Sequence, residues 1–596
     1  MREMHFDAVI VGSGFGGSVM AYRLAEAGLR VCILERGKAY PPNSFPRSPY
    51  DLGKNFWDPS EGMYGMYNVW SFKGSGALVS SGLGGGSLIY ANILLRKDEK
   101  WFKEDLPNGG YREWPVTRAD LDPHYEAVEK MMNVQKYPRH HAPYDKTPKM
   151  LAMKEAAERL NPDRKAGLEW MPLNLAVSFR SRPVEYPDDD YPDNPPVVGD
   201  PIEEQYENYH SVKLGRKMPR STCRLCGECD IGCNFGSKNT LDYNYITAAI
   251  HQPRPADIRT LCEVKRFEPL DGGGYAVYYV QHSLEREGKK TNTSALEQTR
   301  ITCKRLILAA GTFGTPFLLL KMKDNDAAFR HLSRRLGSRY CVNGDLLSFI
   351  IKSIEKNNGK GVPRRLDPSF GPVITSAIRF GDTLDEQGLQ GRGFYVEDGG
   401  NPYLVSWLTE ISGLPSFLSR TYQFLKIIAK YRLGLRNDAD LGAEISDLIG
   451  PANSSKSSMP VLTMGRDVPN AKLCLKEGRL ECDWTLKSSQ EYYDRIRRSV
   501  RAIARALNAE YMDNPSYAWN FHQVLTAHPL GGCPMAQTAD EGVVDPQGET
   551  FGYPGLYIAD GSVMPGPVGP NPSLTIAAFA NRSADHIIDQ HEGEKR

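Results

Sequence analysis

The sequence lacks an imbalance of charge and lacks any long run of apolar residues. Its formal net charge is only +1 at pH 7, which argues against nucleic-acid binding as the main role. No stretch approaches the roughly 18 uninterrupted apolar residues of a membrane-spanning helix. The first residues show no cationic region and no apolar segment ahead of a cleavage site, so we expect a cytoplasmic protein.

Internal repeats and low-complexity tracts are also absent. At 596 residues the chain exceeds what one hydrophobic core supports, so two or more domains are expected. Residues 6–36 have the pattern strand, glycine turn, helix, strand, which is typical of a βαβ unit. Residues 520–596 return to strand, turn and helix, and end in a helical pattern over 573–589. The stretch between, 330–520, shows short strand-like runs and turns, which predicts a substrate domain inserted into a discontinuous dinucleotide domain.

Shorter patterns add detail to this organisation. The Tyr- and Val-rich run 275–281 predicts a strand, and 239–250 has helical spacing. Residues 180–215 are rich in Pro, Asp and Tyr, and we expect a long loop there.

A glycine motif follows the first strand. Gly12, Gly14 and Gly17 have the spacing G-x-G-x-x-G, with Phe15 and Gly16 between the last two glycines. Such glycines permit a tight turn and let backbone N–H groups approach a pyrophosphate at a helix N-terminus. Glu35 closes the second strand, where a carboxylate can hold ribose hydroxyls. The motif predicts a dinucleotide site but does not by itself separate FAD from NAD.

Three further segments favour FAD. Residues 307–312, Ile-Leu-Ala-Ala-Gly-Thr, resemble the returning strand of large flavoprotein oxidoreductases. Residues 556–561, Leu-Tyr-Ile-Ala-Asp-Gly, resemble the strand whose terminal aspartate contacts the ribityl–phosphate part of FAD. Residues 82–87, Gly-Leu-Gly-Gly-Gly-Ser, resemble the glycine loop that passes close to an isoalloxazine ring.

Two of these segments, with two more, resemble one family. Residues 82–88 and 528–533 (His-Pro-Leu-Gly-Gly-Cys) are similar to segments of the glucose–methanol–choline family, in particular its bacterial cholesterol oxidase branch. Residues 560–562 and 569–572 extend the resemblance, whereas 330–520 match only loosely. The resemblance implies FAD and oxidation of an alcohol by hydride transfer to flavin N5. It also implies a substrate-binding domain built on an antiparallel sheet, so the predicted fold class is α/β (α+β).

The resemblance also implies the catalytic residues. His528 corresponds to the family's active-site histidine and Asn571 to its partner. Independently of the resemblance, imidazole is the side chain suited to remove a hydroxyl proton near neutral pH, and Asn571 with Pro572 is typical of a helix start. Such a helix N-terminus favours negative charge on a reduced flavin. Glu397 is the local counterpart of a glutamate that serves as a base in cholesterol oxidases, although an exposed carboxylate at a strand end is the alternative.

These arguments give a set of residues and a division of the chain. The predicted cofactor-binding residues are Gly12, Gly14, Phe15, Gly16, Gly17, Glu35, Gly82, Gly84, Gly85, Gly86, Ser87, Ala310, Gly311, Asp560, Gly561 and Pro572. The predicted FAD-binding domain comprises 1–100, 220–325 and 520–596. The substrate-binding domain and its excursions comprise 101–219 and 326–519.

Four of the eleven cysteines lie close together in the sequence: Cys223, Cys226, Cys229 and Cys233. Their spacing is that of an iron–sulfur loop, although Asn234 follows where bacterial ferredoxins have Pro. A tetrahedral zinc site and unliganded thiols packed in a loop remain alternatives. If a cluster is present, electrons would leave the flavin one at a time.

A basic amphipathic stretch, 416–436, fits peripheral contact with an anionic membrane. An ordinary domain helix with solvated cations is the alternative interpretation. Two functions remain open at this point. The first is oxidation of a bulky apolar alcohol, such as a sterol, a terpenoid or a long-chain alcohol, with dioxygen or another acceptor taking the electrons. The second is an electron-transfer or redox flavoprotein that uses the cysteine loop.

Overall fold

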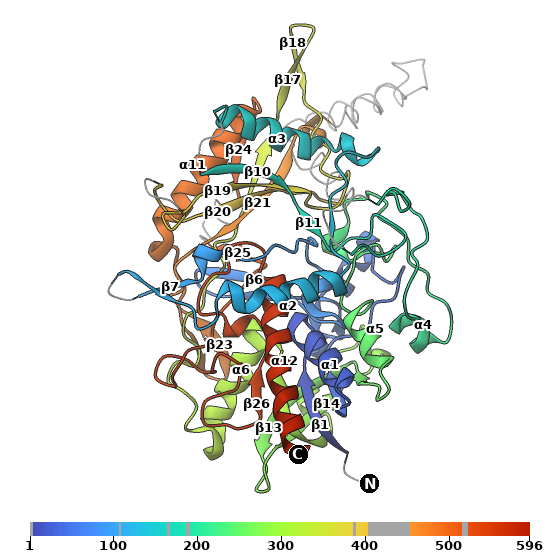
Figure 1. The fold of residues 1–596 in the computed structure, drawn as a ribbon, viewed down its shortest axis with the longest axis vertical. Coiled ribbons are helices and arrows are strands. Elements are labelled where there is room, and N and C mark those ends of the chain that lie inside the picture. Colours follow the sequence, from blue (N-terminus) through green and yellow to red (C-terminus); the bar gives the residue numbers. More distant parts are fainter. Residues whose placement is uncertain are drawn as a thin grey trace, which may run out of the picture.

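Two large sheets, one above the other in Figure 1, organise the molecule. The structure is a computed structural model and describes residues 4–106, 109–163, 167–185, 191–385, 389–402, 453–514 and 523–595. Both chain ends lie at the lower end of the view, beside the seven-stranded sheet. The six-stranded sheet occupies the upper part.

The seven-stranded sheet has the order β12-β2-β1-β15-β14-β13, with β26 paired to β15. Its strands are β1 (His5–Val11), β2 (Val31–Leu34), β12 (Asp257–Arg259), β13 (Cys262–Pro269), β14 (Tyr275–Gln281), β15 (Gln298–Leu308) and β26 (Leu556–Ile558). The pairs β1–β2, β1–β15, β2–β12 and β15–β26 are parallel. Parallel strands are buried on both faces, which explains their continuous apolar runs.

The register of this sheet brings distant parts of the chain to one edge. Leu308 pairs with Val11 on one side and with Ile558 on the other. The carboxyl ends of β1, β15 and β26 therefore meet, and ligands of such sheets bind outside these ends. Helix α1 (Phe15–Glu26) starts there and packs against α12 (Ser573–Lys595), which Figure 1 shows beside it.

The six-stranded sheet is antiparallel throughout, with the order β10-β19-β20-β21-β16-β24. Its strands are β10 (Leu168–Pro172), β16 (Leu346–Ile351), β19 (Ser376–Phe380), β20 (Phe394–Asp398), β21 (Met459–Gly465) and β24 (Glu510–Asp513). Helices α3 (Pro148–Leu160) and α11 (Gln490–Ala506) pack against it. Side chains alternate between the faces of a strand. On β20, Phe394 and Val396 join the core with these helices, so Glu397 lies on the opposite face.

The predicted α/β class is confirmed, with differences at individual elements. The strand predicted over 275–281 is β14, but only the second half of the helical pattern 239–250 forms a helix, α5 (Tyr245–Ile250). The predicted loop 180–215 contains a short helix, α4 (Tyr209–Leu214). Helix α12 begins at Ser573, where the helical pattern 573–589 begins, and the Pro572 carbonyl accepts from the Ile576 N–H, so Pro572 precedes the helix instead of being its first residue.

Candidate active site

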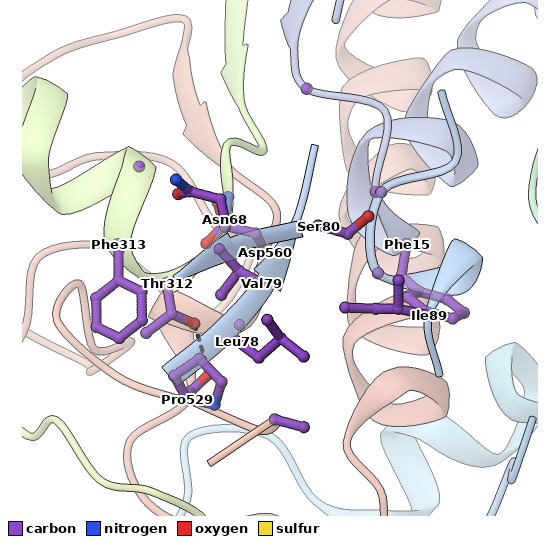
Figure 2. A pocket seen from close by; sticks show the side chains of 18 of the residues that line it. Phe15, Asn68, Leu78, Val79, Ser80, Ile89, Thr312, Phe313, Pro529 and Asp560 are labelled. Carbon is purple, nitrogen blue, oxygen red and sulfur yellow. Dashed lines mark hydrogen bonds between the residues drawn. The ribbon is translucent and has the colours of Figure 1, made fainter. Parts of the chain in front are cut away.

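A cavity of about 870 Å³ lies where the two sheets face one another. The carboxyl ends of the parallel strands supply one part of its wall, and the antiparallel sheet supplies Leu347, Pro460 and Leu462. Figure 2 shows Leu78, Val79 and Ser80 on β6 (Ser75–Ser80), with Ile89 and Phe15 beside them. Other large apolar residues of the wall include Trp70, Ile93, Phe313, Phe317, Leu318 and Ile374.

The glycine motif lies at the cavity in two different roles. A β-carbon on Gly14 would meet no atom within 4 Å, so this position opens into the cavity that it lines. A β-carbon on Gly16 would instead overlap the Ala559 carbonyl oxygen, and one on Gly17 the Gly12 carbonyl oxygen. Gly12 has φ +98°, which L side chains rarely adopt. The motif therefore leaves space for a ligand at Gly14 and packs the helix tightly at Gly16 and Gly17.

Glu35 holds this loop from the end of β2. Its Oε2 accepts from the Ser13 backbone N–H (3.0 Å) and hydroxyl (2.7 Å), and its Oε1 accepts from the Gly37 N–H (2.8 Å). Glu35 also lines the cavity. A carboxylate in this place, beside a helix N-terminus, fits the ribose and pyrophosphate of a dinucleotide.

The second glycine loop divides in the same way. Gly85 and Gly86 line the cavity, and a β-carbon on Gly86 would meet no atom within 4 Å. The other predicted residues of the loop, Gly82, Gly84 and Ser87, are not among the residues that line the cavity. The Ser87 hydroxyl donates to the Gly84 carbonyl (2.8 Å) and accepts from the Leu241 N–H (3.1 Å), which fixes the shape of the loop.

Asp560 joins two chain segments below the cavity. Its Oδ2 accepts from the Gly311 N–H (2.9 Å) and the Thr315 hydroxyl (2.5 Å), and its Oδ1 from the Ser562 N–H and hydroxyl. Burial raises the pKa of this carboxyl, against the hydrogen bonds that it accepts. Ala310, Gly311, Asp560, Gly561 and Pro572 all line the cavity.

His528 and Asn571 line the same cavity, although 43 positions separate them in the sequence. His528 follows β25 (Val524–Thr526), and Figure 2 shows the Thr312 hydroxyl donating to the next residue, Pro529 (2.7 Å). Asn571 lies two residues before the start of α12 and is 5% exposed. Its Oδ1 has no hydrogen-bond partner among the described residues, so this acceptor is available to a ligand.

The loop that carries Asn571 is tied down by two buried side chains. The Lys97 ammonium donates to the Pro567 (2.8 Å) and Val568 (3.0 Å) carbonyls, and burial lowers its pKa well below the ordinary value. Asn343 donates to the Pro570 carbonyl (3.1 Å) and accepts from the Gly569 N–H (2.9 Å). No sequence pattern pointed to either residue.

Glu397 is fully buried on the cavity-side face of β20, so the alternative of an exposed strand-end carboxylate is wrong. Neither of its oxygens has a hydrogen-bond partner among the described residues. Burial raises the pKa of Glu397 well above the ordinary value, and the nearby Asn571 amide offsets only part of that shift. Burial therefore favours the neutral form of Glu397, which lies beside the candidate site with unused hydrogen-bonding capacity.

His528 has a carboxylate partner that the sequence analysis missed. Its Nδ1 lies 2.9 Å from Asp345 Oδ1 and 3.1 Å from Oδ2. Asp345 also accepts from the Thr526 hydroxyl (2.8 Å) and the Ala527 N–H (2.9 Å). Because 183 positions separate the two residues, no spacing in the sequence indicated this pair.

The structure does not support an iron–sulfur cluster or a zinc site at the cysteine loop. Cys223 is buried and Cys226, Cys229 and Cys233 are half-buried, all as free cysteines. In the ranges that the structure describes, which include this loop, no group of three or more His, Cys, Asp or Glu side chains is placed to hold a metal ion.

The basic stretch 416–436 lies outside the described residues, so peripheral membrane contact remains a prediction. No helix in the described part of the chain is both long and apolar enough to cross a membrane.

Comparisons with known proteins found family models, sequence relatives and solved structures that are similar to this chain. Residues 475–580 match the family model for GMC oxidoreductases, and 10–62 match that for an NAD(P)-binding Rossmann-like domain. The chain is 30% identical over 599 aligned residues to a cholesterol oxidase of Mycobacterium tuberculosis, covering 99% of this chain and 92% of that protein. It is 25% identical to a cholesterol oxidase of Acinetobacter baumannii, covering 100% and 97%. The fold is similar to pyridoxine 4-oxidase from Mesorbium loti, with a TM-score of 0.56, 16% identity, and 97% and 98% of the two chains covered.

Proposed function

The chain belongs to the glucose–methanol–choline (GMC) family of oxidoreductases, and from this premise we propose that it oxidises an alcohol to a carbonyl compound with FAD as its cofactor. The observation that carries the proposal is the meeting of His528 and Asn571 in one largely apolar cavity with the glycine loops. The residues present fit FAD, because Gly14 and Gly86 leave open space where a β-carbon would project. When bound, FAD supplies the acceptor for the substrate hydride at N5 of its isoalloxazine ring.

We propose that His528 takes the hydroxyl proton of the alcohol. Loss of a hydride from a carbinol carbon requires the loss of that proton, and imidazole suits this role near neutral pH. Asn571 hydrogen-bonds the hydroxyl and orients its carbon. Glu397 acts as a neutral hydrogen-bonding group beside them, since its buried carboxyl resists ionisation.

The proposed substrate is a bulky, largely apolar alcohol such as a sterol, a terpenoid or a long-chain alcohol. Aromatic and aliphatic side chains that include Trp70, Phe313, Phe317 and Leu462 line the cavity, and burying apolar surface against them favours such ligands. Relatives named for cholesterol and for long-chain alcohols agree with this class. Dioxygen or another carrier then accepts the electrons. The proposed FAD-binding domain comprises 1–100, 220–325 and 520–596, and the remainder forms the substrate-binding domain.

Anaerobic mixing of the holoenzyme with sterols, terpenols and fatty alcohols tests the proposal. A substrate of this class should bleach the visible absorbance of the flavin. His528→Ala should retain FAD but slow the bleaching by about 100-fold or more, the usual contribution of a general base. The matched control is His251→Ala, because His251 is exposed and bonds the Glu207 carbonyl away from the cavity. Bleaching by no alcohol, or an unimpaired His528→Ala protein, would contradict the proposal.

A further inference from the structure

We propose that Asp345 is a positioning residue for the oxidation, holding His528 with its proton on Nδ1 and its bare Nε2 available to the substrate hydroxyl. This inference rests on the proposed function, because it assigns Asp345 a task only if His528 takes the proton. It concerns one contact, between a carboxylate on the substrate side of the cavity and an imidazole on the C-terminal segment.

The geometry of the contact determines which ring nitrogen carries the proton. Asp345 approaches Nδ1 with both oxygens, at 2.9 and 3.1 Å, and an ionised carboxylate can only accept hydrogen bonds. Nδ1 must therefore carry a proton, and both hydrogen bonds that the ring makes to the described residues are at Nδ1, with none at Nε2. The imidazole side chain is 14% exposed and lines the cavity. The nitrogen without a protein partner is the one left for a substrate.

Asp345 is itself held rigidly. Its side chain is 1% exposed, and it accepts from the Thr526 hydroxyl and the Ala527 N–H as well as from His528. The Thr526 oxygen also accepts from the His528 backbone N–H (2.8 Å). The histidine is thus fixed at its backbone and at its ring by one connected set of hydrogen bonds, which is how preorganised sites keep their geometry.

The two residues come from different parts of the fold. Asp345 stands immediately before β16, whose Leu347 lines the cavity. His528 belongs to the segment that pairs with Cys341 through Leu530 and bonds Gly561 through Gly531. The contact therefore ties the antiparallel sheet to the cofactor side at the point where the proton moves. Two other acids lie near this pair, Glu397 and Asp467. The negative charge of Asp345 contributes to raising the pKa of both.

Asp345→Asn tests the role with nearly unchanged volume. An amide can either accept from Nδ1–H or donate to a bare Nδ1, so the requirement for one tautomer is lost. The variant should keep its FAD content and Tm close to wild type, and anaerobic flavin reduction should slow by about 100-fold or more with little change in KM. Asp467→Asn is the matched control, because Asp467 is buried next to the same turn and bonds the Val342 N–H but does not contact His528.

A readout independent of activity follows the imidazole itself. The ¹⁵N resonances of labelled histidine, with His528 assigned by subtraction of His528→Gln, should report a protonated Nδ1 in wild type and in Asp467→Asn. Asp345→Asn should shift the population toward a protonated Nε2. An unchanged tautomer in Asp345→Asn, or a protonated Nε2 in wild type, would overturn the inference even if no alcohol is oxidised.

A double variant separates positioning from a general structural role. If Asp345 acts through His528, adding Asp345→Asn to His528→Gln should change the reduction rate by less than about threefold. Multiplication of the two single effects would overturn the inference. Failure of wild type to reduce flavin with any alcohol would instead contradict the proposed function, and the tautomer measurement would then judge the contact alone.

Discussion

Two carboxylic acids near His528 have opposite surroundings. Asp345 receives hydrogen bonds from three residues, whereas the oxygens of Glu397 receive none in the described part of the chain. A buried carboxyl without donors is more stable in its neutral form. This difference favours our proposal that His528, and not Glu397, takes the proton.

Glu397→Gln should stabilise the protein, and increasingly so as the pH rises. Burial raises the pKa of Glu397 in the folded state. The folded protein therefore keeps the Glu397 proton at pH values above about 4.3, where the unfolded chain has lost it. The wild-type free energy of unfolding then falls with rising pH, by up to about 1.4 kcal/mol per pH unit until the folded-state pKa is reached. Glutamine is always neutral and escapes this loss.

Denaturant unfolding of wild type and Glu397→Gln at pH 5 through 8 measures the difference. The same exchange at Glu169, an exposed residue on β10 of the same sheet, should give a difference that does not vary with pH. A stability difference for Glu397→Gln that stays flat or shrinks as the pH rises would show that Glu397 is ionised in the folded protein.

Residue identities at the site were predictable only where a local motif carried them. His528 and Asn571 lie in short segments that resemble a family, and the structure places both at the cavity. Asp345, Lys97 and Asn343 act through hydrogen bonds to residues far away in the chain. A single sequence holds no record of such contacts.

At the scale of elements, the glycines of the motif fall into two groups. Gly14 leaves space for a ligand, whereas Gly16 allows the helix to pack closely. Gly14→Ala should leave the fold intact, because Gly14 has φ −68° and ψ −168° and a β-carbon there meets no atom within 4 Å. The methyl group would enter the space assigned to FAD and should raise the dissociation constant by about tenfold or more, about 1.4 kcal/mol. Gly16→Ala should instead lower stability by about 1–3 kcal/mol, since its methyl overlaps the Ala559 carbonyl.

Titration of the apoprotein with FAD and thermal unfolding of the apoprotein check the two variants. Gly272→Ala serves as the control, because a β-carbon there meets nothing within 4 Å, its φ lies outside the left-handed region, and Gly272 is not among the cavity residues. Normal FAD affinity of Gly14→Ala, or an undisturbed Gly16→Ala apoprotein, would contradict this division.

The success of the sequence analysis also varied by element. The parallel strands were predictable because burial on both faces makes their carboxyl-terminal segments apolar, as in residues 8–11 of β1 and 306–308 of β15. Helix α11 was missed, although Tyr492, Ile496, Val500 and Ile503 have the spacing of a buried helical face. Its mean composition is polar and strongly basic, and that composition obscured the periodicity.

At the scale of the whole molecule, the cavity exists only when three distant parts of the chain fold together. Gly14 near the start, Gly311 in the middle and Asn571 near the end all line it. The resemblance predicted this meeting of the two ends. The shape of the substrate side was not predictable, because alternation along an antiparallel sheet decides which residues face inward, and the motifs there matched weakly.

FAD should therefore stabilise the entire chain and not only one part. A ligand that binds the folded state alone raises the free energy of unfolding by about 2.7 kcal/mol at 100 times its dissociation constant. Removal of FAD should lower the Tm measured by calorimetry, and re-addition should restore it in proportion to the logarithm of the FAD concentration. NAD⁺ at equal concentration should give no such shift, since the three segments that favour FAD converge on the cavity. Gly14→Ala should need more FAD for the same Tm. If the apoprotein unfolds at the holoprotein's Tm, the cavity does not depend on FAD, and the assignment of the three segments to its binding is wrong.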